Sequence, residues 1–240
     1  MKNVLITGVS RGVGLEMTKK FILLGYNVFG VSRTITDETE ELKKEYPNNF
    51  THKILDLSDT DNLISEIKEM IPNSTPIHGF INNAAIAYDD LITNMSLIKL
   101  EKMYRVNVFS PMLLTKYVIR NMIFNKIKGS IVHISSISTQ TGYKGLSMYA
   151  STKGSLEAFS KNISREWGVK GIRSNCLVAG FMETEMSSSL DEELKSKIFN
   201  RTSLKKPTSL DSVSNTVEFL ISDKSESITG QLINVDSGTI

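Results

Sequence analysis

The sequence predicts an α/β fold, in which a parallel sheet is covered by helices on both of its faces. Two observations predict it. Short runs rich in β-branched residues alternate with longer amphipathic segments along the whole chain, a pattern typical of parallel sheets. A glycine-rich turn follows the first of these runs and opens the first helical segment. Right-handed crossovers then make the predicted architecture a doubly wound Rossmann sheet of seven strands.

Taken in order, each β-branched run is expected to be a strand, and the amphipathic segments between the runs are expected to be helices. The strands are Asn3–Thr7, Asn27–Val31, Thr51–Leu55, Gly79–Asn82, Ser130–Ser135, Arg173–Val178 and Gln231–Val235. The helices lie near Gly12–Leu24, Asp37–Glu45, Thr60–Met70, Leu97–Asn125, Met148–Trp167 and Ser209–Ile221. No linker, low-complexity segment or internal repeat interrupts this alternation, so residues 1–240 are expected to form one domain. Residues 180–208 fall in the longest stretch without a predicted strand and are expected to form a lid over a site.

Composition and charge are those of an ordinary soluble protein. The 240 residues are 40% hydrophobic and 22% charged, and 28 basic against 26 acidic side chains give a formal net charge of +2. Such a small excess gives no reason to expect a nucleic acid or an anionic membrane as a partner. The single cysteine, Cys176, excludes an internal disulfide and fits a reducing cytosol as a buried apolar side chain.

Three further observations favour a cytoplasmic protein without a metal. No apolar stretch approaches the ~20 residues of a membrane helix, and the short apolar run that ends at Thr7 does not read as a secretory signal. His52, His78 and His133 are not clustered at the spacing of metal ligands, so no metal site is predicted.

The glycine-rich turn has the pattern G-x-x-x-G-x-G, formed by Gly8, Gly12 and Gly14. Glycines let the backbone turn tightly and approach a pyrophosphate, and the N-terminus of the following helix attracts an anion. A dinucleotide is therefore expected here, with a turn that binds no ligand as the alternative.

The residues after the second predicted strand indicate which dinucleotide binds. A site for NAD(H) usually places a carboxylate there to hold the ribose hydroxyls, but this sequence has Ser32, Arg33 and Thr34. Arg33, together with Arg11 in the glycine turn, would suit a 2′-phosphate. These residues favour NADP(H) over NAD(H), unless both arginines are ordinary solvated charges.

Polar residues also end the third and fourth predicted strands. Asp56 would either accept a hydrogen bond from an adenine amino group or cap the helix that follows. Asn82, Asn83 and Ala84 would allow close approach to a ribose, or would tie the sheet edge through hydrogen bonds.

Ser136 and the pair Tyr149-x-x-x-Lys153 form the pattern that points to chemistry. Residues four apart share one helix face, so the phenol and the ammonium are expected side by side. The ammonium would lower the phenol pKa from its usual value of about 10 towards the range of general acid–base catalysis. The Ser136 hydroxyl would hydrogen-bond an oxygen that becomes negative when hydride arrives.

In combination these motifs resemble the short-chain dehydrogenase/reductase family in its single-domain form. The resemblance covers essentially the whole chain. The motifs stand in the family's order: Thr7-Gly8-x-x-x-Gly12-x-Gly14, Asp56, Asn82-Asn83-Ala84, Asn107, Ser136, Tyr149-x-x-x-Lys153 and Gly180-x-x-x-Thr184. Ala85 and Ala179 stand where the family usually has glycine and proline, and neither change removes a catalytic group.

The resemblance implies a role for each of these residues. Tyr149 would be the general acid, and Lys153 would lower its pKa and bind the nicotinamide ribose. Ser136, rather than Ser135, would orient the carbonyl, and Asn107 would fix a water between Lys153 and solvent. The residues expected to contact the cofactor are Gly8, Ser10, Arg11, Gly12, Val13, Gly14, Arg33, Asp56, Leu57, Asn83, Ala84, Tyr149, Lys153, Gly180, Met182 and Thr184.

The resemblance also implies partners and a substrate. Family members commonly form tetramers through two long helices, here the segments Leu97–Asn125 and Met148–Trp167, so a homo-tetramer is expected, with a dimer as the alternative. Within the family the sequence is most similar to 3-oxoacyl-acyl-carrier-protein reductases. A docking patch for an acidic carrier protein would then be edged by Lys126, Lys128, Lys170 and Arg173.

Two alternatives to a 3-oxoacyl reductase stay open. A reductase of sugars, secondary metabolites or small ketones would carry the same motifs, and a dinucleotide-binding protein without catalytic activity is less favoured. Apolar residues of the expected lid either line an apolar cleft or serve as packing residues, namely Phe181, Met182, Met186 and Leu190.

Overall fold

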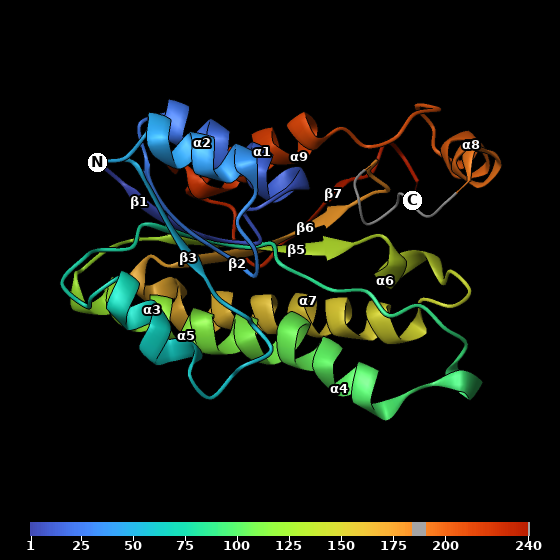
Figure 1. The fold of residues 1–240 in the computed structure, drawn as a ribbon, viewed down its shortest axis with the longest axis horizontal. Helices are drawn as coiled ribbons and strands as arrows, with labels where there is room; N and C mark the ends of the chain where they lie inside the picture. Colours follow the sequence, from blue (N-terminus) through green and yellow to red (C-terminus); the bar gives the residue numbers. More distant parts are fainter. Residues whose placement is uncertain (184–190, 240) are drawn as a thin grey trace.

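The computed structural model describes residues 1–183 and 191–239, and a seven-stranded parallel sheet lies at its centre (Figure 1). The strands are β1 (Asn3–Thr7), β2 (Asn27–Ser32), β3 (Phe50–Ile54), β4 (Gly79–Asn82), β5 (Ser130–Ser136), β6 (Arg173–Ala179) and β7 (Leu232–Val235). Their order in the sheet is β3-β2-β1-β4-β5-β6-β7, and every neighbouring pair is parallel. The predicted doubly wound Rossmann fold is confirmed.

Helices cover both faces of this sheet (Figure 1). One face carries α1 (Gly12–Leu23), α2 (Asp37–Glu45) and α9 (Leu210–Ile221). The other face carries α3 (Leu63–Met70), α4 (Leu97–Tyr104), α5 (Ser110–Phe124) and α7 (Ser147–Trp167). The short α6 (Ser138–Thr141) and α8 (Glu192–Arg201) lie beyond the carboxyl ends of the strands. Among the described residues, no helix is long and apolar enough to span a bilayer.

Each central strand is buried on both faces, and its alternate side chains enter two separate cores. In β1, Val4 and Ile6 belong to the core that includes residues of α1 and α9. Leu5 belongs to the core that includes residues of α3, α5 and α7. All residues of β1 are buried, which explains why this strand is a continuous apolar run in the sequence.

The helix predicted over Leu97–Asn125 is one helical stretch interrupted by a π turn at Arg105–Phe109. There the N–H of Ser110 donates to the carbonyl of Arg105, five residues earlier. Pro111 follows at the start of α5 and has no N–H, so it cannot make the bond that an α-helix would direct to the Asn107 carbonyl. Apolar residues continue through the turn at helical spacing, and for this reason the pattern predicted a single helix.

The helix predicted from Thr60 begins three residues later, at Leu63. Asp59 accepts hydrogen bonds from both the backbone and the side chain of Asn62, and this turn occupies the residues before the helix. The other predicted boundaries lie within one residue of those observed. Helices α6 and α8 were not predicted; α8 falls within residues 180–208, which were expected to form a lid.

The strand order changes direction between β1 and β4, because the chain leaves β1 for β2 on one side and returns to β4 on the other. In doubly wound sheets the crevice beyond the carboxyl ends of such strands is the usual ligand site. The glycine turn after β1, Asn83 after β4 and Ser136 at the end of β5 all lie at this edge.

Candidate active site

Tyr149, Lys153 and Ser136 come together where α7 passes the carboxyl end of β5. Lys153 is buried, and its ammonium lies 5.7 Å from the centroid of the Tyr149 ring. It donates a 2.8 Å hydrogen bond to the carbonyl of Ile134, two residues before Ser136. The backbone of β5 therefore fixes the lysine beside the phenol, as the four-residue spacing predicts.

Burial moves the pKa values of these two groups in opposite directions. It lowers the pKa of Lys153 to about 8, and the interactions with Cys176 and Glu157 act against this shift. Burial raises the pKa of Tyr149, the charge of Asp89 raises it further, and a hydrogen bond with Ser136 lowers it. The net shift is thus opposite to the lowering expected from the ammonium, because loss of hydration is its largest cause. Tyr149 is a protonated donor throughout the neutral range.

Asn107 lies in the π turn and joins two parts of the site. Its side-chain oxygen accepts from the N–H of Ile86 at 2.9 Å, and its amide donates to the Ile86 carbonyl at 2.8 Å and to the Thr152 hydroxyl at 3.1 Å. The chain after β4 is thereby tied to α7 at the residue before Lys153. A water beside Asn107 would find an acceptor in its backbone carbonyl, which Pro111 leaves without its α-helical donor. That role stays a prediction.

The glycine turn is shaped by two close approaches. Gly8 has a φ of +76°, and a Cβ there would lie 2.9 Å from the side-chain nitrogen of Asn83. A Cβ on Gly14 would lie 1.9 Å from the carbonyl oxygen of Gly8, so the first turn of α1 packs against the end of β1 only because residue 14 is glycine. The result is a backbone cradle at the N-terminus of α1, which fits the pyrophosphate of a dinucleotide.

Asn83 and Ala84 hold this cradle against β4. Their backbone N–H groups both donate to the hydroxyl of Thr7 at 3.0 Å. The Asn83 side chain donates to the carbonyls of Thr7 and Gly8, at 2.9 and 3.2 Å. Asn82 is buried and faces His133, with 3.3 Å between its side-chain nitrogen and Nδ1 of the ring. Of the two alternatives for these amides, tying the sheet edge is observed, and contact with a ribose stays a prediction.

The two arginines predicted to bind a 2′-phosphate lie on segments that are joined to each other. Arg11 precedes α1, Arg33 follows β2, and both are exposed. The Thr36 hydroxyl donates to the carbonyl of Ser10 at 3.0 Å, which ties the segment after β2 to the glycine turn.

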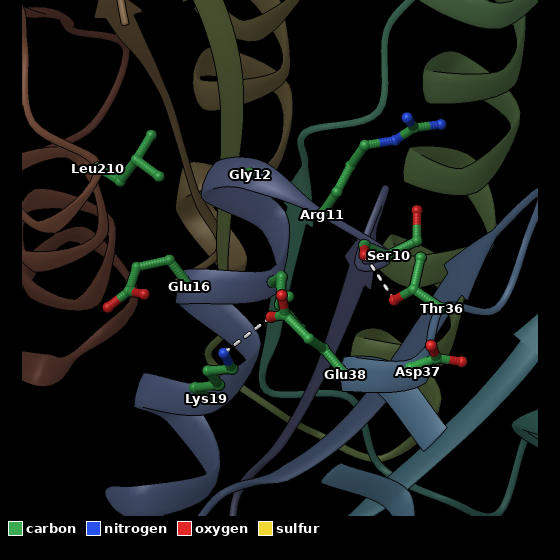
Figure 2. A pocket seen from close by; sticks show the side chains of 10 residues that line it. Ser10, Arg11, Gly12, Glu16, Lys19, Thr36, Asp37, Glu38 and Leu210 are labelled. Atoms are coloured by element: carbon green, nitrogen blue, oxygen red, sulfur yellow. Dashed lines mark hydrogen bonds and ion pairs between the residues drawn. The ribbon is translucent and has the colours of Figure 1, made fainter. Parts of the chain in front are cut away.

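A surface pocket of about 500 Å³ lies beside these residues (Figure 2). It is lined by Ser10, Arg11, Gly12, Leu15, Glu16, Lys19, Thr36, Asp37, Glu38 and Leu210. Figure 2 shows Ser10 and Arg11 at one end of the pocket and the ion pair between Lys19 and Glu38, 3.1 Å long, at the other. The end near the glycine turn therefore presents a cation and a hydroxyl, which suits a phosphate.

Asp56 closes a turn instead of capping a helix. One of its oxygens accepts from the N–H and the hydroxyl of Ser58, at 2.8 and 2.9 Å. These bonds, with the charges of Lys102 and Arg33, lower the pKa of Asp56. The expected cap role is therefore wrong, since Asn62 is the residue before α3. Leu57 is buried, and its carbonyl accepts from the Ser110 hydroxyl.

The start of the expected lid packs tightly on β7. Gly180 donates to the carbonyl of Val235 at 2.9 Å, and a Cβ on Gly180 would lie 2.5 Å from the Cα of Asp236. Met182 is partly buried against the core on the α1 side of the sheet. Phe181 contacts Phe199 of α8, with ring centroids 5.8 Å apart. The predicted site residue Thr184, like Met186 and Leu190, lies outside the described residues.

Two acids that lie near Ser136, Tyr149 and Lys153 were not predicted from the sequence. Glu157, one helical turn after Lys153, accepts hydrogen bonds from the hydroxyls of Ser135 and Thr139. Its signal was present in the sequence, because it extends the four-residue spacing of Tyr149 and Lys153 by one step. Asp89, whose charge acts on Tyr149, lies in the loop after β4, and no local pattern places a loop residue beside a helix.

Comparison with known proteins agrees with this geometry. Residues 8–239 match the family model described as enoyl-(acyl carrier protein) reductase. The 3-oxoacyl-acyl-carrier-protein reductase of Buchnera aphidicola subsp. Schizaphis graminum is 34% identical over 237 residues, which cover 99% of this chain and 96% of that protein.

Two solved structures have the same fold over nearly the whole chain. A 4-hydroxyisoleucine dehydrogenase complexed with NADH has a TM-score of 0.94 at 24% identity, covering 100% of this chain and 98% of its own. A gluconate 5-dehydrogenase from Burkholderia cenocepacia J2315, in complex with NADP and tartrate, has a TM-score of 0.91 at 25% identity, covering 99% and 94%. On these matches, with Ser136, Tyr149 and Lys153 at one end of the sheet, the chain belongs to the short-chain dehydrogenase/reductase family of oxidoreductases, which act on CH–OH and C=O groups.

Proposed function

We propose that this protein reduces a carbonyl group with NADPH and that the carbonyl belongs to a 3-oxoacyl thioester. One observation supports the reductase proposal. Tyr149, Lys153 and Ser136 lie at the carboxyl ends of the strands, as does the glycine cradle formed by Gly8 and Gly14. The identity of 34% to a 3-oxoacyl-acyl-carrier-protein reductase supports the thioester.

The residues of the chain handle the proton in this reaction. The reduced nicotinamide supplies a hydride to the carbonyl carbon. The carbonyl oxygen takes the proton of the Tyr149 phenol, which its raised pKa keeps in place until transfer. Ser136 donates a hydrogen bond to the same oxygen, and the Lys153 ammonium stabilises the phenolate left behind. Solvent then returns the proton by way of Lys153 and Asn107.

For the cofactor, we propose that the pyrophosphate lies against the glycine turn and that Arg11 and Arg33 bind the 2′-phosphate. This arrangement selects NADP(H), because the segment after β2 offers an arginine where an NAD(H) site needs a carboxylate. Val13 and Leu57 are buried, so their proposed contacts go through backbone atoms. The contacts at Ser10, Ala84, Gly180, Met182 and Thr184 rest on the family resemblance.

We propose that a carrier protein docks at exposed lysines that lie far from Ser136. Lys126, Lys128 and Lys170 are exposed, but they precede β5 and β6 and so lie at the sheet edge opposite Ser136. Arg173 does not belong to the patch: its guanidinium is half-buried and donates to the carbonyls of Leu220 and Ser222 at 2.9 Å. A carrier protein bound at these three lysines would have to extend its thioester along the length of the strands to reach Ser136. Otherwise it would have to deliver the thioester to the active site of a neighbouring subunit.

A homo-oligomer supplies such a neighbour, and we propose a tetramer built on α5 and α7. Small or exposed residues on these helices leave room for another subunit. A Cβ added to Gly154 of α7 would meet nothing within 4 Å, and Phe109, just before α5, is 50% exposed. In the cytoplasm, where we place the protein, Cys176 would stay a buried thiol.

The second candidate is reduction of a sugar or another hydroxylated ketone. The acid Asp89 beside Tyr149 favours it, since a carboxylate at the mouth of the site accepts hydrogen bonds from hydroxyl groups. A gluconate 5-dehydrogenase is among the proteins with the same fold. A non-catalytic protein is disfavoured, because such a protein has no need for Ser136, Tyr149, Lys153 and Asn107 together.

An NADPH-oxidation screen separates these candidates. Acetoacetyl thioesters, keto-sugars and simple ketones are compared at equal concentration with wild-type protein, and with Tyr149→Phe as the blank. We expect the highest kcat/KM with the thioester. Turnover confined to the other substrates moves the assignment to the second candidate, and no turnover of any carbonyl removes the reductase proposal.

A further inference from the structure

We propose that Glu157 is a positioning residue of this active site, which holds the turn carrying Ser136 in place and keeps Lys153 protonated. The inference rests on the proposed reductase function. Glu157 does not touch the reacting atoms; it acts through Ser135, Thr139 and Lys153. It lies outside the motif residues that this chain shares with the short-chain dehydrogenase/reductase family.

Three residues of α7 contact three successive residues of β5. Tyr149, Lys153 and Glu157 are spaced by four and so lie along one side of the helix. Their partners are the Ser136 side chain for Tyr149, the Ile134 carbonyl for Lys153 and the Ser135 hydroxyl for Glu157. With the last of these contacts, the helix holds each of the last three residues of β5.

Glu157 also holds the chain on the other side of Ser136. The same carboxylate oxygen accepts from the Thr139 hydroxyl at 2.9 Å, and that hydroxyl lies 2.9 Å from the carbonyl of Ser136. Ser135 and Thr139 thus bind one oxygen from the two ends of the turn that contains Ser136. Because Ser135 is buried, replacing its partner would leave a buried hydroxyl unpaired, and the turn would relax.

The negative charge of Glu157, one helical turn after Lys153, also acts on this lysine. The other groups near this lysine are His133 on β5, Cys176 on β6 and Tyr149 on its own helix. Burial keeps all three neutral in the physiological range: it lowers the pKa of His133 to about 3, raises that of Cys176 to about 12 and raises that of Tyr149. Asp89 acts on Tyr149 instead. Cys176 and Glu157 both act to raise the Lys153 pKa, but a thiol whose pKa is about 12 carries no charge in this range. Among the described residues, the carboxylate of Glu157 is therefore the charged group that opposes the loss of the Lys153 proton.

Three variants separate the two parts of this role. Glu157→Gln keeps an oxygen for Ser135 and Thr139 but removes the charge. Ser135→Ala keeps the charge but removes one of the two hydrogen bonds. Glu166→Gln is the matched control, since Glu166 is an exposed acid on the same helix. Each variant is assayed by NADPH oxidation with the best substrate of the screen, from pH 6 to 10, beside wild type and Tyr149→Phe.

Glu157→Gln should move the alkaline limb of the kcat/KM profile to lower pH, because the Lys153 pKa falls when this charge is lost. Ser135→Ala should lower kcat by about 10- to 100-fold without moving that limb, since it disturbs only the placement of Ser136. Glu166→Gln should match wild type. An unmoved limb in Glu157→Gln, or a wild-type kcat in Ser135→Ala, overturns the corresponding half of the proposal. Turnover by Tyr149→Phe would instead overturn the reductase mechanism on which it rests.

A measurement without substrate checks the charge directly. The folded Lys153 has a pKa of about 8 and the unfolded one 10.5, so between these values the unfolded chain holds the extra proton and stability rises with pH. In Glu157→Gln this rise should begin at lower pH than in wild type and in Glu166→Gln. Urea midpoints from pH 6.5 to 9 measure it, and the comparison between variants cancels the contribution of Cys176. A rise that begins at the same pH in all three proteins contradicts the charge role.

Discussion

At the scale of single residues, Tyr149 and Lys153 lie one helical turn apart, and burial keeps one protonated while it makes the other easier to deprotonate. A phenol that holds its proton at neutral pH is suited to donate it to a carbonyl oxygen during reduction. An ammonium whose pKa falls to about 8 is suited to pass a proton on. Tyr149 is therefore the proton donor, and Lys153 replaces the proton that Tyr149 gives away. Loss of Tyr149 should stop the reaction.

Replacing Tyr149 by phenylalanine tests that division of labour. The change removes the proton donor and keeps the ring, so kcat should fall by about 10²- to 10⁴-fold. Binding of NADPH should change little, because the ammonium of Lys153 keeps its bond to the Ile134 carbonyl. Single-turnover rates and NADPH fluorescence titrations measure the two quantities. An unchanged rate would sink the mechanism.

Arg33 is the residue on which the choice of cofactor depends. Arg33→Asp replaces a 2′-phosphate ligand with the carboxylate that an NAD(H) site uses, so kcat/KM should fall at least about tenfold with NADPH and fall less, or rise, with NADH. Lys68→Asp, at an exposed position of α3, is the control for the same reversal of charge. Equal use of both cofactors by wild type would remove the argument for NADP(H).

At the scale of elements, the sequence predicts strands and helices well because their signals are local. The strand Asn3–Thr7 is apolar throughout, as burial on both faces demands. The π turn at Arg105–Phe109 was not predicted, since the apolar spacing continues through it and only Pro111 marks the missing bond. The turn that binds Ser58 to Asp56 was not predicted either, because an acid after a strand fits a cap, a turn or a ligand equally well.

The packing of α1 against β1 gives a prediction at this scale. Gly14→Ala places a methyl 1.9 Å from the carbonyl oxygen of Gly8, and the backbone has to move to admit it. We expect a loss of about 3 kcal/mol or more in the free energy of unfolding, together with loss of NADPH binding.

Gly168→Ala is the matched control for that substitution. Gly168 ends α7 with helical dihedral angles, and a Cβ there would meet nothing within 4 Å. Its effect should stay within about 1 kcal/mol, on the stabilising side. Urea unfolding curves of the two variants measure the difference, and similar stabilities for both would show that the cradle tolerates a side chain.

At the scale of the whole molecule, the site exists because seven parallel strands end at one edge. The glycine turn, Asn83, Asn107, Ser136 and Tyr149 come from five separate stretches of the chain. The motifs in the sequence predict that these residues belong to one site, but not which other residues contact them in the folded protein. The charge of Asp89 acts on Tyr149, and the charge of Lys153 acts on His133, only because β4 and β5 are neighbours in the sheet. Long-range packing of this kind leaves no periodic signal in the sequence.

The core itself should make the protein sensitive to mild acid. His133 is fully buried between Phe80 and Phe159, and burial, with the charge of Lys153, lowers its pKa from 6.5 to about 3. Between these values the unfolded chain binds a proton that the folded chain does not, so stability falls as pH falls through this window. His133 alone should cost roughly 2–3 kcal/mol of stability between pH 7 and pH 4.5. His52 and His78 shift in the same direction.

His133→Leu isolates this contribution, because leucine fills a similar volume and does not titrate. The carboxylates whose pKa values are lowered, such as Asp56 and Asp223, act mainly below about pH 4.5. The raised pKa of Asp89 and the lowered pKa values of His52 and His78 contribute equally to both proteins, so the difference between the two pH slopes belongs to His133. Urea midpoints measured from about pH 4.5 to 6.5 should slope less steeply for the variant than for wild type, whatever their absolute values. Parallel slopes would mean that His133 gains its proton without unfolding the protein, and the buried ring would then have a path to solvent through the site beside Lys153.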